Sequence, residues 1–381
     1  MADLFSPERP VRRLMPDHVF IAGVIVLLGI GLVTLYSAST SFAQRFMGNR
    51  LYFISRQLVY GAVGVPLFVM ASVVPLKFVR ALVPLAITLA AVLCVLTFVP
   101  YIGVSKNGAA RWISIGDFSY QPSEMVKFVL PLYLAHIFDK NQKQIDSFAR
   151  GILPPTFITT LFFLLIYMQN NFSTAVFITV NALIMFYIAG VKFRYFLGAA
   201  VILVPVCALL VFTSSHRLLR VITFFWPDQD PLGAAYQLRS SIISIGSGGI
   251  WGRGIGKGVR KISSVPEIQS DFIFSAYTEE MGFAGVLLFY LAFMVFAARG
   301  YRTALKQEDT FKCLLAFGLV TTIASQALIN IAVASGMLPV TGIPLPFFSA
   351  GGSSLITCLA AAGLIVNVSR FKKDTGESDA F

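Results

Sequence analysis

The chain carries little charge and few of the side chains that bind metals or form disulfides. Charged residues make up 13% of the 381 residues, against roughly 25% in soluble domains. Three histidines and four scattered cysteines, without CxxC spacing, form no pattern of a zinc site or a disulfide framework. No HExxH string occurs either, so zinc-dependent hydrolysis has no visible machinery.

The chain has apolar sequence instead. Hydrophobic residues make up 56% and the mean hydropathy is +0.77, more apolar surface than a soluble protein covers, so most of the chain belongs in a bilayer. A membrane-spanning helix needs about 20 apolar residues, and this template predicts an all-α polytopic membrane protein with ten transmembrane helices. The predicted spans are 18–37, 57–75, 79–100, 122–138, 153–169, 172–190, 195–213, 271–297, 312–335 and 351–369.

Basic residues predict the orientation of these spans. An even number of spans places both termini on one side. The segments on that side hold seventeen Lys and Arg residues, and the short loops on the other side hold five. Because basic loops stay inside, both termini are expected in the cytoplasm. The chain then divides into a cytoplasmic segment (1–17), a transmembrane domain (18–369) and a cytoplasmic tail (370–381).

One outer loop, residues 214–270 between the seventh and eighth spans, is far longer than ordinary connections, and such loops are usually functional or disordered. Its seven basic and three acidic residues suit an anionic partner at the membrane surface, such as a lipid phosphate. A solvated loop that happens to be basic would have the same composition. Seven glycines between Gly246 and Gly258 predict either a turn that cradles a pyrophosphate or a tight re-entrant bend.

Three ionisable residues stand out because a charge at bilayer depth costs roughly 2.5–3.5 kcal/mol on insertion scales. Glu124 and Lys127 are three apart, hence on one face of the fourth predicted helix. They either neutralise each other or line a polar cavity open to the outside. Asp271 begins the eighth predicted helix, beside the basic loop. It is either an N-terminal cap or a general base for a lipid-phosphate substrate.

Several strings resemble the SEDS family, the polytopic glycosyltransferases of bacterial shape, division and sporulation. The likeness covers about residues 15–370 in matching order and is closer to the division and sporulation branches, FtsW and SpoVE, than to RodA. Asn171 departs from the family, since it stands where the family string QPDxGT has Asp. The strings are Asn107–Ile113, Gln121–Phe128, Asp230–Ser241, the glycine run, Val265–Gly285 and Leu338–Ser354.

The resemblance implies a peptidoglycan glycosyltransferase that polymerises lipid II into glycan strands and releases undecaprenyl pyrophosphate with inversion. The family's essential carboxylate falls on Asp271, which would deprotonate the 4-hydroxyl of the acceptor sugar. Cations would stabilise the leaving group, and Lys257 and Arg260 are further candidates for that role. The implied substrate-binding residues are Arg111, Trp112, Gln121, Glu124, Lys127, Gln237, Arg239, Ser240, Lys261, Glu280, Ser353 and Ser354.

The resemblance also implies the partners. It leaves a place for a divalent cation, Mg²⁺ or Mn²⁺, and for no organic cofactor. The expected partners are lipid II, the growing glycan strand, a class B penicillin-binding transpeptidase and other division proteins in the bacterial cytoplasmic (inner) membrane, with no nucleic acid. Two other functions stay open. A lipid II flippase would need a polar path across the membrane and no general base, and a division-complex scaffold would keep only a vestigial site.

Overall fold

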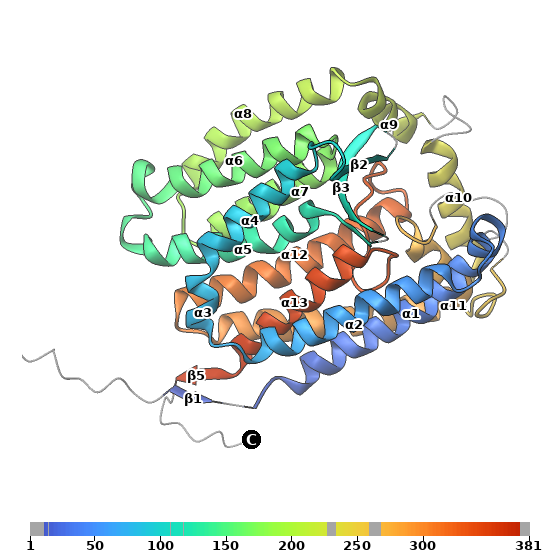
Figure 1. Cartoon of the computed structure of the whole chain (residues 1–381), viewed down its shortest axis with the longest axis horizontal. Helices are drawn as coiled ribbons and strands as arrows, with labels where there is room; N and C mark the ends of the chain where they lie inside the picture. Colours follow the sequence, from blue (N-terminus) through green and yellow to red (C-terminus); the bar gives the residue numbers. More distant parts are fainter. Residues whose placement is uncertain are drawn as a thin grey trace, which may run out of the picture.

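The computed structural model describes residues 11–13, 15–106, 108–116, 118–226, 234–258 and 268–373. Most of them belong to helices that lie side by side in a bundle (Figure 1). The helices are α1 (His18–Met47), α2 (Tyr52–Val73), α3 (Leu76–Ala81), α4 (Val83–Leu96), α5 (Pro122–Lys140), α6 (Leu153–Met168), α7 (Phe172–Ile188), α8 (Phe193–Phe212), α9 (Ser215–Phe225), α10 (Ala234–Ser247), α11 (Ile273–Leu305), α12 (Thr310–Ala334) and α13 (Gly352–Ser369), with short turns η1 (Gln142–Gln144) and η2 (Phe148–Ile152).

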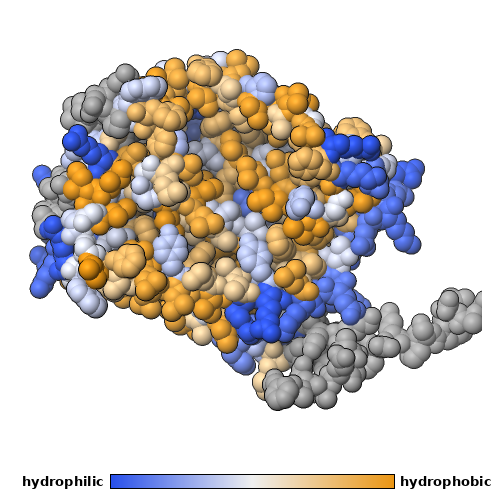
Figure 2. Space-filling view, turned by 180° about the vertical axis from the view of Figure 1, so that it is seen from behind, coloured by the Kyte–Doolittle hydropathy of each residue, from blue (hydrophilic) through white to orange (hydrophobic). Residues whose placement is uncertain are grey.

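The helices of the described residues are those of a multi-pass membrane protein. Seven of them are long and apolar enough to cross a membrane, namely α1, α2, η2 with α6, α8, α11, α12 and α13, and α4 and α7 are shorter apolar helices. These nine helices lie close to predicted spans. The predicted span 79–100 differs, because the structure has two separate helices there, α3 and α4. Figure 2 shows apolar side chains over the middle of the molecule and hydrophilic ones toward its two ends.

Local sequence explains where the first helix begins and ends. The Asp17 carboxylate accepts a hydrogen bond from the Phe20 N–H at 3.0 Å and so caps the first turn of α1. Gly48 ends the helix in the left-handed conformation, at φ +67°. Helix α12 begins in the same way, because the Asp309 side chain accepts a hydrogen bond from the Lys312 N–H at 3.0 Å.

Helices α2 and α13 share the most extensive contact between helices. A Cβ at Gly363 would lie 2.3 Å from the carbonyl oxygen of Phe68, so only glycine fits this close approach. Near the end of the same contact, the Asn367 amide donates to the Ala71 and Val74 carbonyls at 2.7 and 2.6 Å. Small residues and one buried amide therefore hold the last helix against the second.

The all-α prediction needs a correction, because the described residues include two small antiparallel sheets. Strands β2 (Gly103–Lys106), β3 (Ala109–Ile115) and β4 (Phe118–Tyr120) form one sheet between α4 and α5. Strands β1 (Val11–Arg13) and β5 (Phe371–Lys373) form the other. A connection of more than twenty residues needs its own backbone hydrogen bonds, and strands β2, β3 and β4, called the hairpin from here on, supply them. The first sheet lies at the end of the bundle that carries α9 and α10, and β1, β5 and α3 lie at the opposite end (Figure 1).

The predicted long outer loop contains two helices, α9 and α10. Helix α10 packs on α11 and on the end of α12, where the Ser241 hydroxyl donates to the Ala334 carbonyl at 2.7 Å. The glycine run follows α10 and packs against a break in α11 at Gly282, where φ is +62° and ψ is −165°.

Backbone groups join the glycine run to this break. The N–H groups of Arg253 and Gly254 donate to the carbonyls of Glu279 and Glu280, both at 3.0 Å. In return the Phe283 N–H donates to the Gly249 carbonyl at 2.9 Å. These amides of the glycine run satisfy carbonyls that the broken helix frees, so the structure favours the tight bend over the pyrophosphate turn.

Gly282→Ala should destabilise the protein. Its backbone conformation is one that essentially only glycine adopts, at a cost of about 1–3 kcal/mol for another residue, and a Cβ there would lie 2.2 Å from the Gly252 nitrogen. The midpoint of thermal unfolding in detergent should fall. The matched control is Gly198→Ala on α8, where no atom lies within 4 Å of the added Cβ, and this variant should unfold at the wild-type midpoint or above. Equal midpoints for both variants would contradict the prediction.

Candidate functional site

Asp271 lies just before α11, at the end of the bundle that carries the hairpin. The N-cap position of α11 is Phe272, so Asp271 stands one residue outside the helix, and the interpretation of Asp271 as the helix cap is wrong. Its side chain is half-buried and faces the connection between α12 and α13, because a Cβ on Gly342 would lie 3.4 Å from Asp271 Oδ2.

Hydrogen bonds from distant segments hold the backbone around Asp271. The Asn330 side-chain amide donates to the Asp271 carbonyl at 3.0 Å and to the Ile343 carbonyl at 2.8 Å. The Ala350 N–H donates to the Gln269 carbonyl at 2.8 Å. Helix α12 and the end of the α12–α13 connection thus clamp residues 269–271, which fixes the position of the carboxylate.

Arginine side chains carry positive charge close to Asp271. Arg111 lies on β3, is half-buried and donates to the Asn170 carbonyl, which ties the hairpin to the α6–α7 connection. Burial lowers the pKa of Arg111, repulsion from Arg220 lowers it further, and attraction to Asp271 acts in the opposite direction. Arg220 lies on α9 and donates to the Val340 carbonyl at 3.2 Å. Arg111 therefore lies within electrostatic reach of both Arg220 and Asp271.

Glu124 and Lys127 form a buried ion pair on the first turns of α5. Lys127 Nζ lies 2.7 Å from Glu124 Oε2, and the two side chains are 1% and 4% exposed for Lys127 and Glu124, respectively. The ammonium also donates to Gln326 Oε1 at 2.9 Å and lies 5.8 Å from the centre of the Phe177 ring. Mutual neutralisation, one of the two alternatives from the sequence, is therefore present, and helices α12 and α7 complete the shell.

The pair is the centre of a polar cluster that joins the N-terminal ends of α5 and α13. The Gln121 N–H donates to Ser353 Oγ at 2.9 Å, and the Gln121 side chain donates to Ser123 Oγ at 3.0 Å. The Gln326 amide donates to Ser354 Oγ at 3.4 Å. The structure thus brings five predicted binding residues together around one buried polar core, namely Gln121, Glu124, Lys127, Ser353 and Ser354.

Helix α12 links this cluster to Asp271. Gln326 and Asn330 are four apart, hence on one face of the helix and about 6 Å apart along its axis. Gln326 holds Lys127 and also donates to the Pro344 carbonyl at 2.9 Å, and Asn330 holds Asp271 and the Ile343 carbonyl. One helix face and residues 342–344 therefore connect the buried ion pair to the carboxylate at the rim.

Other predicted residues lie elsewhere. Trp112 is half-buried on β3, where it pairs with Val104. Gln237, Arg239 and Ser240 lie on α10, where Gln237 is half-buried, Arg239 exposed and Ser240 buried. Their helix packs on α11, α9 and α12, outside the polar cluster.

Glu280 belongs to a separate environment at the break in α11. It is buried, accepts a hydrogen bond from Ser37 Oγ of α1 at 2.6 Å and lies beside the glycine run. Lys257 is exposed on that run. Arg260 and Lys261 lie outside the described residues.

Asn171, the departure from the family string, lies beside the cluster as well. It is buried before α7 and donates to Ser123 Oγ at 3.4 Å. An amide donor at this position therefore joins the α7 end to the first turn of α5.

A protein-held metal centre does not fit the described residues. Among them, no three His, Cys, Asp or Glu side chains lie close enough together to hold an ion. The described residues thus offer Asp271 no set of further ligands for an ion, so no step of the mechanism is assigned to a resident metal.

Three residues around Asp271 were missed by the sequence prediction, namely Arg220, Asn330 and Gly342. The signal for Arg220 was present, because Arg217 and Arg220 are three apart and so share a face of any helix in the loop. Gln326 and Asn330 offered a second signal, as two amides four apart in an apolar helix. Gly342 had none, since its role depends on a neighbour about seventy residues away in the sequence.

Known proteins resemble this chain over nearly its whole length. The profile of the family described as cell cycle protein, FtsW/RodA/SpoVE, matches residues 17–374. Stage V sporulation protein E of Bacillus subtilis (strain 168) is 36% identical over 362 residues, which are 95% of this chain and 99% of that protein. A probable peptidoglycan glycosyltransferase FtsW of Geobacter sp. (strain M18) is 36% identical over 353 residues, which are 93% of this chain and 96% of that protein.

Solved structures share the fold. One, described as the structural coordination of polymerization and crosslinking by a peptidoglycan synthase complex, has a TM-score of 0.77 at 26% identity and covers 94% of this chain and 98% of its own. The crystal structure of the rod shape determining protein RodA of Thermus thermophilus has a TM-score of 0.70 at 25% identity and covers 94% of this chain and 97% of its own. These matches confirm the resemblance that the sequence strings predicted.

Lys127→Met should be strongly destabilising, because it leaves the Glu124 carboxylate buried without its partner, which typically costs about 3–5 kcal/mol. The double variant Glu124→Gln/Lys127→Met should regain much of that loss. Unfolding in mixed detergent micelles measures both variants.

The control for this prediction is Lys192→Met. Lys192 pairs with Asp146 at 3.1 Å, but the two side chains are 52% and 59% exposed, so its loss should cost less than about 1 kcal/mol. A double variant less stable than Lys127→Met alone would show that the cost does not come from an uncompensated charge.

Proposed function

The chain belongs to the FtsW/RodA/SpoVE, or SEDS, family of cell cycle proteins, and from this premise we propose how it acts as a peptidoglycan glycosyltransferase. It polymerises lipid II into glycan strands, with Asp271 as general base and Arg111 and Arg220 as the cations beside the leaving pyrophosphate. The observation that carries the proposal is the clamped position of Asp271 at the same end of the bundle as the backbone-anchored Arg111 and Arg220.

The reaction needs a base and an anion site next to each other. The Asp271 carboxylate accepts the proton of the acceptor sugar's 4-hydroxyl. The freed oxygen attacks the anomeric carbon of the donor and forms the new glycosidic C–O bond. The bond from that carbon to the pyrophosphate oxygen breaks, its electrons leave with undecaprenyl pyrophosphate, and attack from the opposite face inverts the anomeric centre.

The arginines stabilise the charge that develops on the leaving group. Pyrophosphate gains negative charge as its bond to the sugar breaks, and guanidinium groups pair well with phosphate oxygens. Arg111 and Arg220 are each anchored by a hydrogen bond to a backbone carbonyl, of Asn170 and Val340 respectively. Anchored cations need little reorganisation in the transition state, which favours their use in catalysis.

The polar cluster positions the reacting groups. The ion pair of Glu124 and Lys127 is buried below the site and is linked to Asp271 through Gln326 and Asn330 of α12. It fixes the start of α5, directly after the hairpin that carries Arg111. We assign Gln121, Ser353 and Ser354 to this positioning shell. Trp112, Gln237, Arg239, Ser240, Lys261 and Glu280 remain proposed substrate-binding residues.

The reaction takes place at the outer face of the bacterial inner membrane. In this proposal the chain crosses the membrane ten times, by α1, α2, α3 with α4, α5, α6, α7, α8, α11, α12 and α13, with both termini in the cytoplasm. The excess of basic residues at the end of the bundle with the termini supports this orientation. Asp271 and the arginines then face outward, where the sugar of lipid II is expected.

The other proposed components are a metal and a partner. A divalent cation, Mg²⁺ or Mn²⁺, would be held by the Asp271 carboxylate together with ligands other than the described side chains, which offer no set of three metal ligands, and it would supply positive charge to the site. A class B penicillin-binding transpeptidase is the proposed partner, because the similar solved complex couples polymerization to crosslinking. Other division proteins would join this pair during division or sporulation.

Asp271→Asn should abolish polymerisation. The amide cannot accept the hydroxyl proton, and loss of a general base costs about 100- to 10,000-fold in rate. The assay uses purified protein with its transpeptidase and lipid II, and glycan strands are read out on gels. Asp146→Asn, an exposed carboxylate at the opposite end of the bundle, is the matched control and should polymerise at the wild-type rate.

Two results would reject this assignment. Unimpaired polymerisation by Asp271→Asn would remove Asp271 from the chemistry. Translocation of lipid II in liposomes that survives the substitution, without any polymerisation by the wild-type protein, would favour the flippase instead.

Arg220→Gln should slow polymerisation by roughly 100-fold, because one preorganised charge on the leaving group is lost. Its effect should fall mainly on the maximal rate rather than on the lipid II concentration needed for half of it. Arg50→Gln, in the exposed turn between α1 and α2, removes one positive charge from the same end as the control. An equal loss in both variants would mean that net surface charge, rather than Arg220, assists the reaction.

A further inference from the structure

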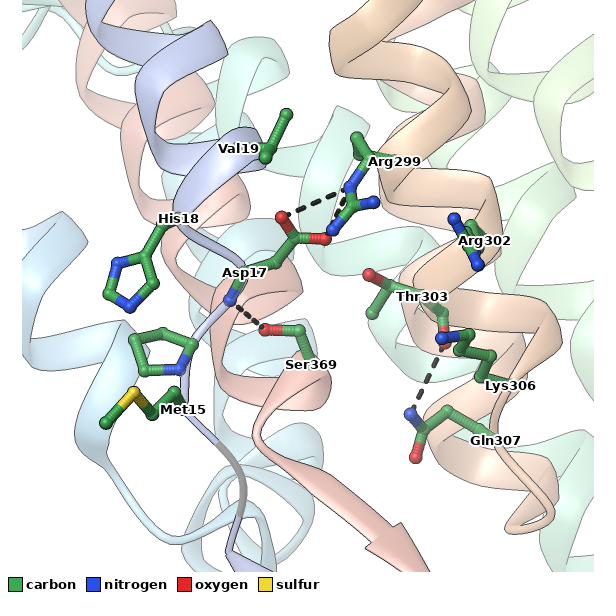
Figure 3. Close-up of a pocket in the computed structure, with 11 residues that line it drawn as sticks. Met15, Asp17, His18, Val19, Arg299, Arg302, Thr303, Lys306, Gln307 and Ser369 are labelled. Carbon is green, nitrogen blue, oxygen red and sulfur yellow. Dashed lines mark hydrogen bonds and ion pairs between the residues drawn. The ribbon is translucent and has the colours of Figure 1, made fainter. Parts of the chain in front are cut away.

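A cavity of about 320 Å³ lies at the end of the bundle opposite Asp271. Figure 3 shows its lining, which comes from the segment before and at the start of α1, from the last turns of α11 and from the end of α13. The chemically active residues of the lining are Asp17, His18, Arg299, Arg302, Lys306 and Ser369. None of them takes part in the proposed glycosyl transfer.

The lining is positively charged. Arg299, Arg302 and Lys306 face a single carboxylate, that of Asp17, which leaves the cavity at about +2 with His18 neutral. Asp17 is paired with Arg299, whose Nε lies 2.9 and 3.2 Å from the two carboxylate oxygens. Within the part of the chain that the structure describes, no acidic side chain pairs with Arg302 or Lys306. Both are exposed and available to an anion.

The cavity wall is held in place by contacts from three helices. Asp17 caps α1, and its own N–H donates to Ser369 Oγ at the end of α13 at 3.2 Å. The Arg299 guanidinium on α11 closes the same group of contacts (Figure 3). Arg302 and Lys306 lie one and two turns further along α11. The Asp17–Arg299 ion pair therefore forms the wall beside two exposed cations, Arg302 and Lys306.

Apolar surface continues from the cavity along the middle of the bundle. An exposed apolar stripe on one face of α11 leads away from Arg302. Its residues precede Arg302 at successive spacings of four, three and four, and they are Ala298, Val295 and Leu291. On α1, Val19 lines the cavity and Ala22 follows it on the exposed face. This surface lies where lipid tails surround a membrane protein.

Further basic residues join the cavity through the backbone. Strand β1 leads into Met15 and β5 follows Ser369, and both Met15 and Ser369 line the cavity. The pairing of these strands places Arg12 opposite Lys372. The pairing of β1 with β5 therefore brings the two terminal segments of the described chain together beside the cavity, and the apolar stripe begins next to it.

We propose that this cavity binds the headgroup of an anionic glycerophospholipid. Arg302 and Lys306 bind the phosphodiester, and the acyl chains lie along the exposed stripe of α11. Basic pockets between transmembrane helices bind anionic headgroups by this chemistry. A free phosphate would use the same cations, but it would gain nothing from the apolar stripe, which is why a lipid is the favoured occupant. Such a lipid would join α1 to α11 at the end of the bundle that holds both termini.

The test uses the full-length protein in micelles of an uncharged detergent, titrated in parallel with phosphatidylglycerol or with phosphatidylcholine. Native mass spectrometry counts the bound lipid, and thermal unfolding follows the shift of the midpoint. Phosphatidylglycerol should bind and raise the midpoint, and added phosphatidylcholine should do neither. Arg302→Gln/Lys306→Gln should bind phosphatidylglycerol at least tenfold more weakly, since each basic residue near an anionic surface contributes roughly a factor of five.

Two further variants sharpen the result. Lys143→Gln/Arg150→Gln removes two exposed positive charges in the connection between α5 and α6 at the same end, and it should bind phosphatidylglycerol as the wild type does. Arg302→Lys/Lys306→Arg keeps both charges and should keep binding within about threefold.

Specific outcomes would overturn the proposal. An equal loss in the two glutamine double variants would assign the effect to net charge, and a loss in the charge-preserving variant would exclude an electrostatic site. Equal binding of the two lipids would exclude headgroup recognition. Inorganic phosphate that displaces phosphatidylglycerol at equal concentration would assign the cavity to a free anion. These measurements need no glycan synthesis, so they stand apart from the test of Asp271.

Discussion

The arrangement of the bundle depends on one buried charge. The Lys127 side chain is almost completely buried. A buried ammonium is tolerated only when an opposite charge and hydrogen-bond acceptors compensate it. Glu124 supplies the charge, Gln326 an acceptor and Phe177 an aromatic face. These partners come from α5, α12 and α7, so three helices must keep their register for the charge to stay compensated. A shift of any of these helices would leave the Lys127 charge buried without one of its partners. The free-energy cost of that state favours a single arrangement of the three helices.

The same constraint reaches the rim of the molecule through α12. Gln326 and Asn330 form one polar stripe on an otherwise buried and mostly apolar helix, and both also bind carbonyls of the α12–α13 connection. The connection in turn clamps the residues around Asp271. A catalytic base needs a fixed position more than it needs a special local sequence. For Asp271, the proposed base, a buried ion pair, one helix face and a clamped loop provide it, and the anchored arginines would complete the proposed anion site.

The two ends of the bundle use positive charge differently. At the hairpin end, Arg111 and Arg220 are half-buried and held by backbone carbonyls, which suits a reacting group that must be met in one geometry. At the opposite end, Arg302 and Lys306 are exposed beside the Asp17–Arg299 ion pair, which suits a lipid headgroup held mainly by charge. The glycine run is not part of either of these two groups of cations. It repairs the break in α11 by exchanging backbone hydrogen bonds with it.

The amino-acid sequence by itself determined the membrane setting, the positions of nearly all the apolar helices and the family, because these depend on local hydropathy, spacing and strings. It also determined that Glu124 and Lys127 share a helix face, since three residues separate them. The tertiary structure alone decided that the glycine run is a bend and that residues 103–120 form a hairpin. It also decided that Asn330 and Gly342 lie against Asp271 and that Arg220 binds the α12–α13 connection. Their partners lie tens to more than a hundred residues away along the chain. Hydropathy and periodicity describe only near neighbours, whereas a site is made where distant segments meet, and only packing decides which of them do.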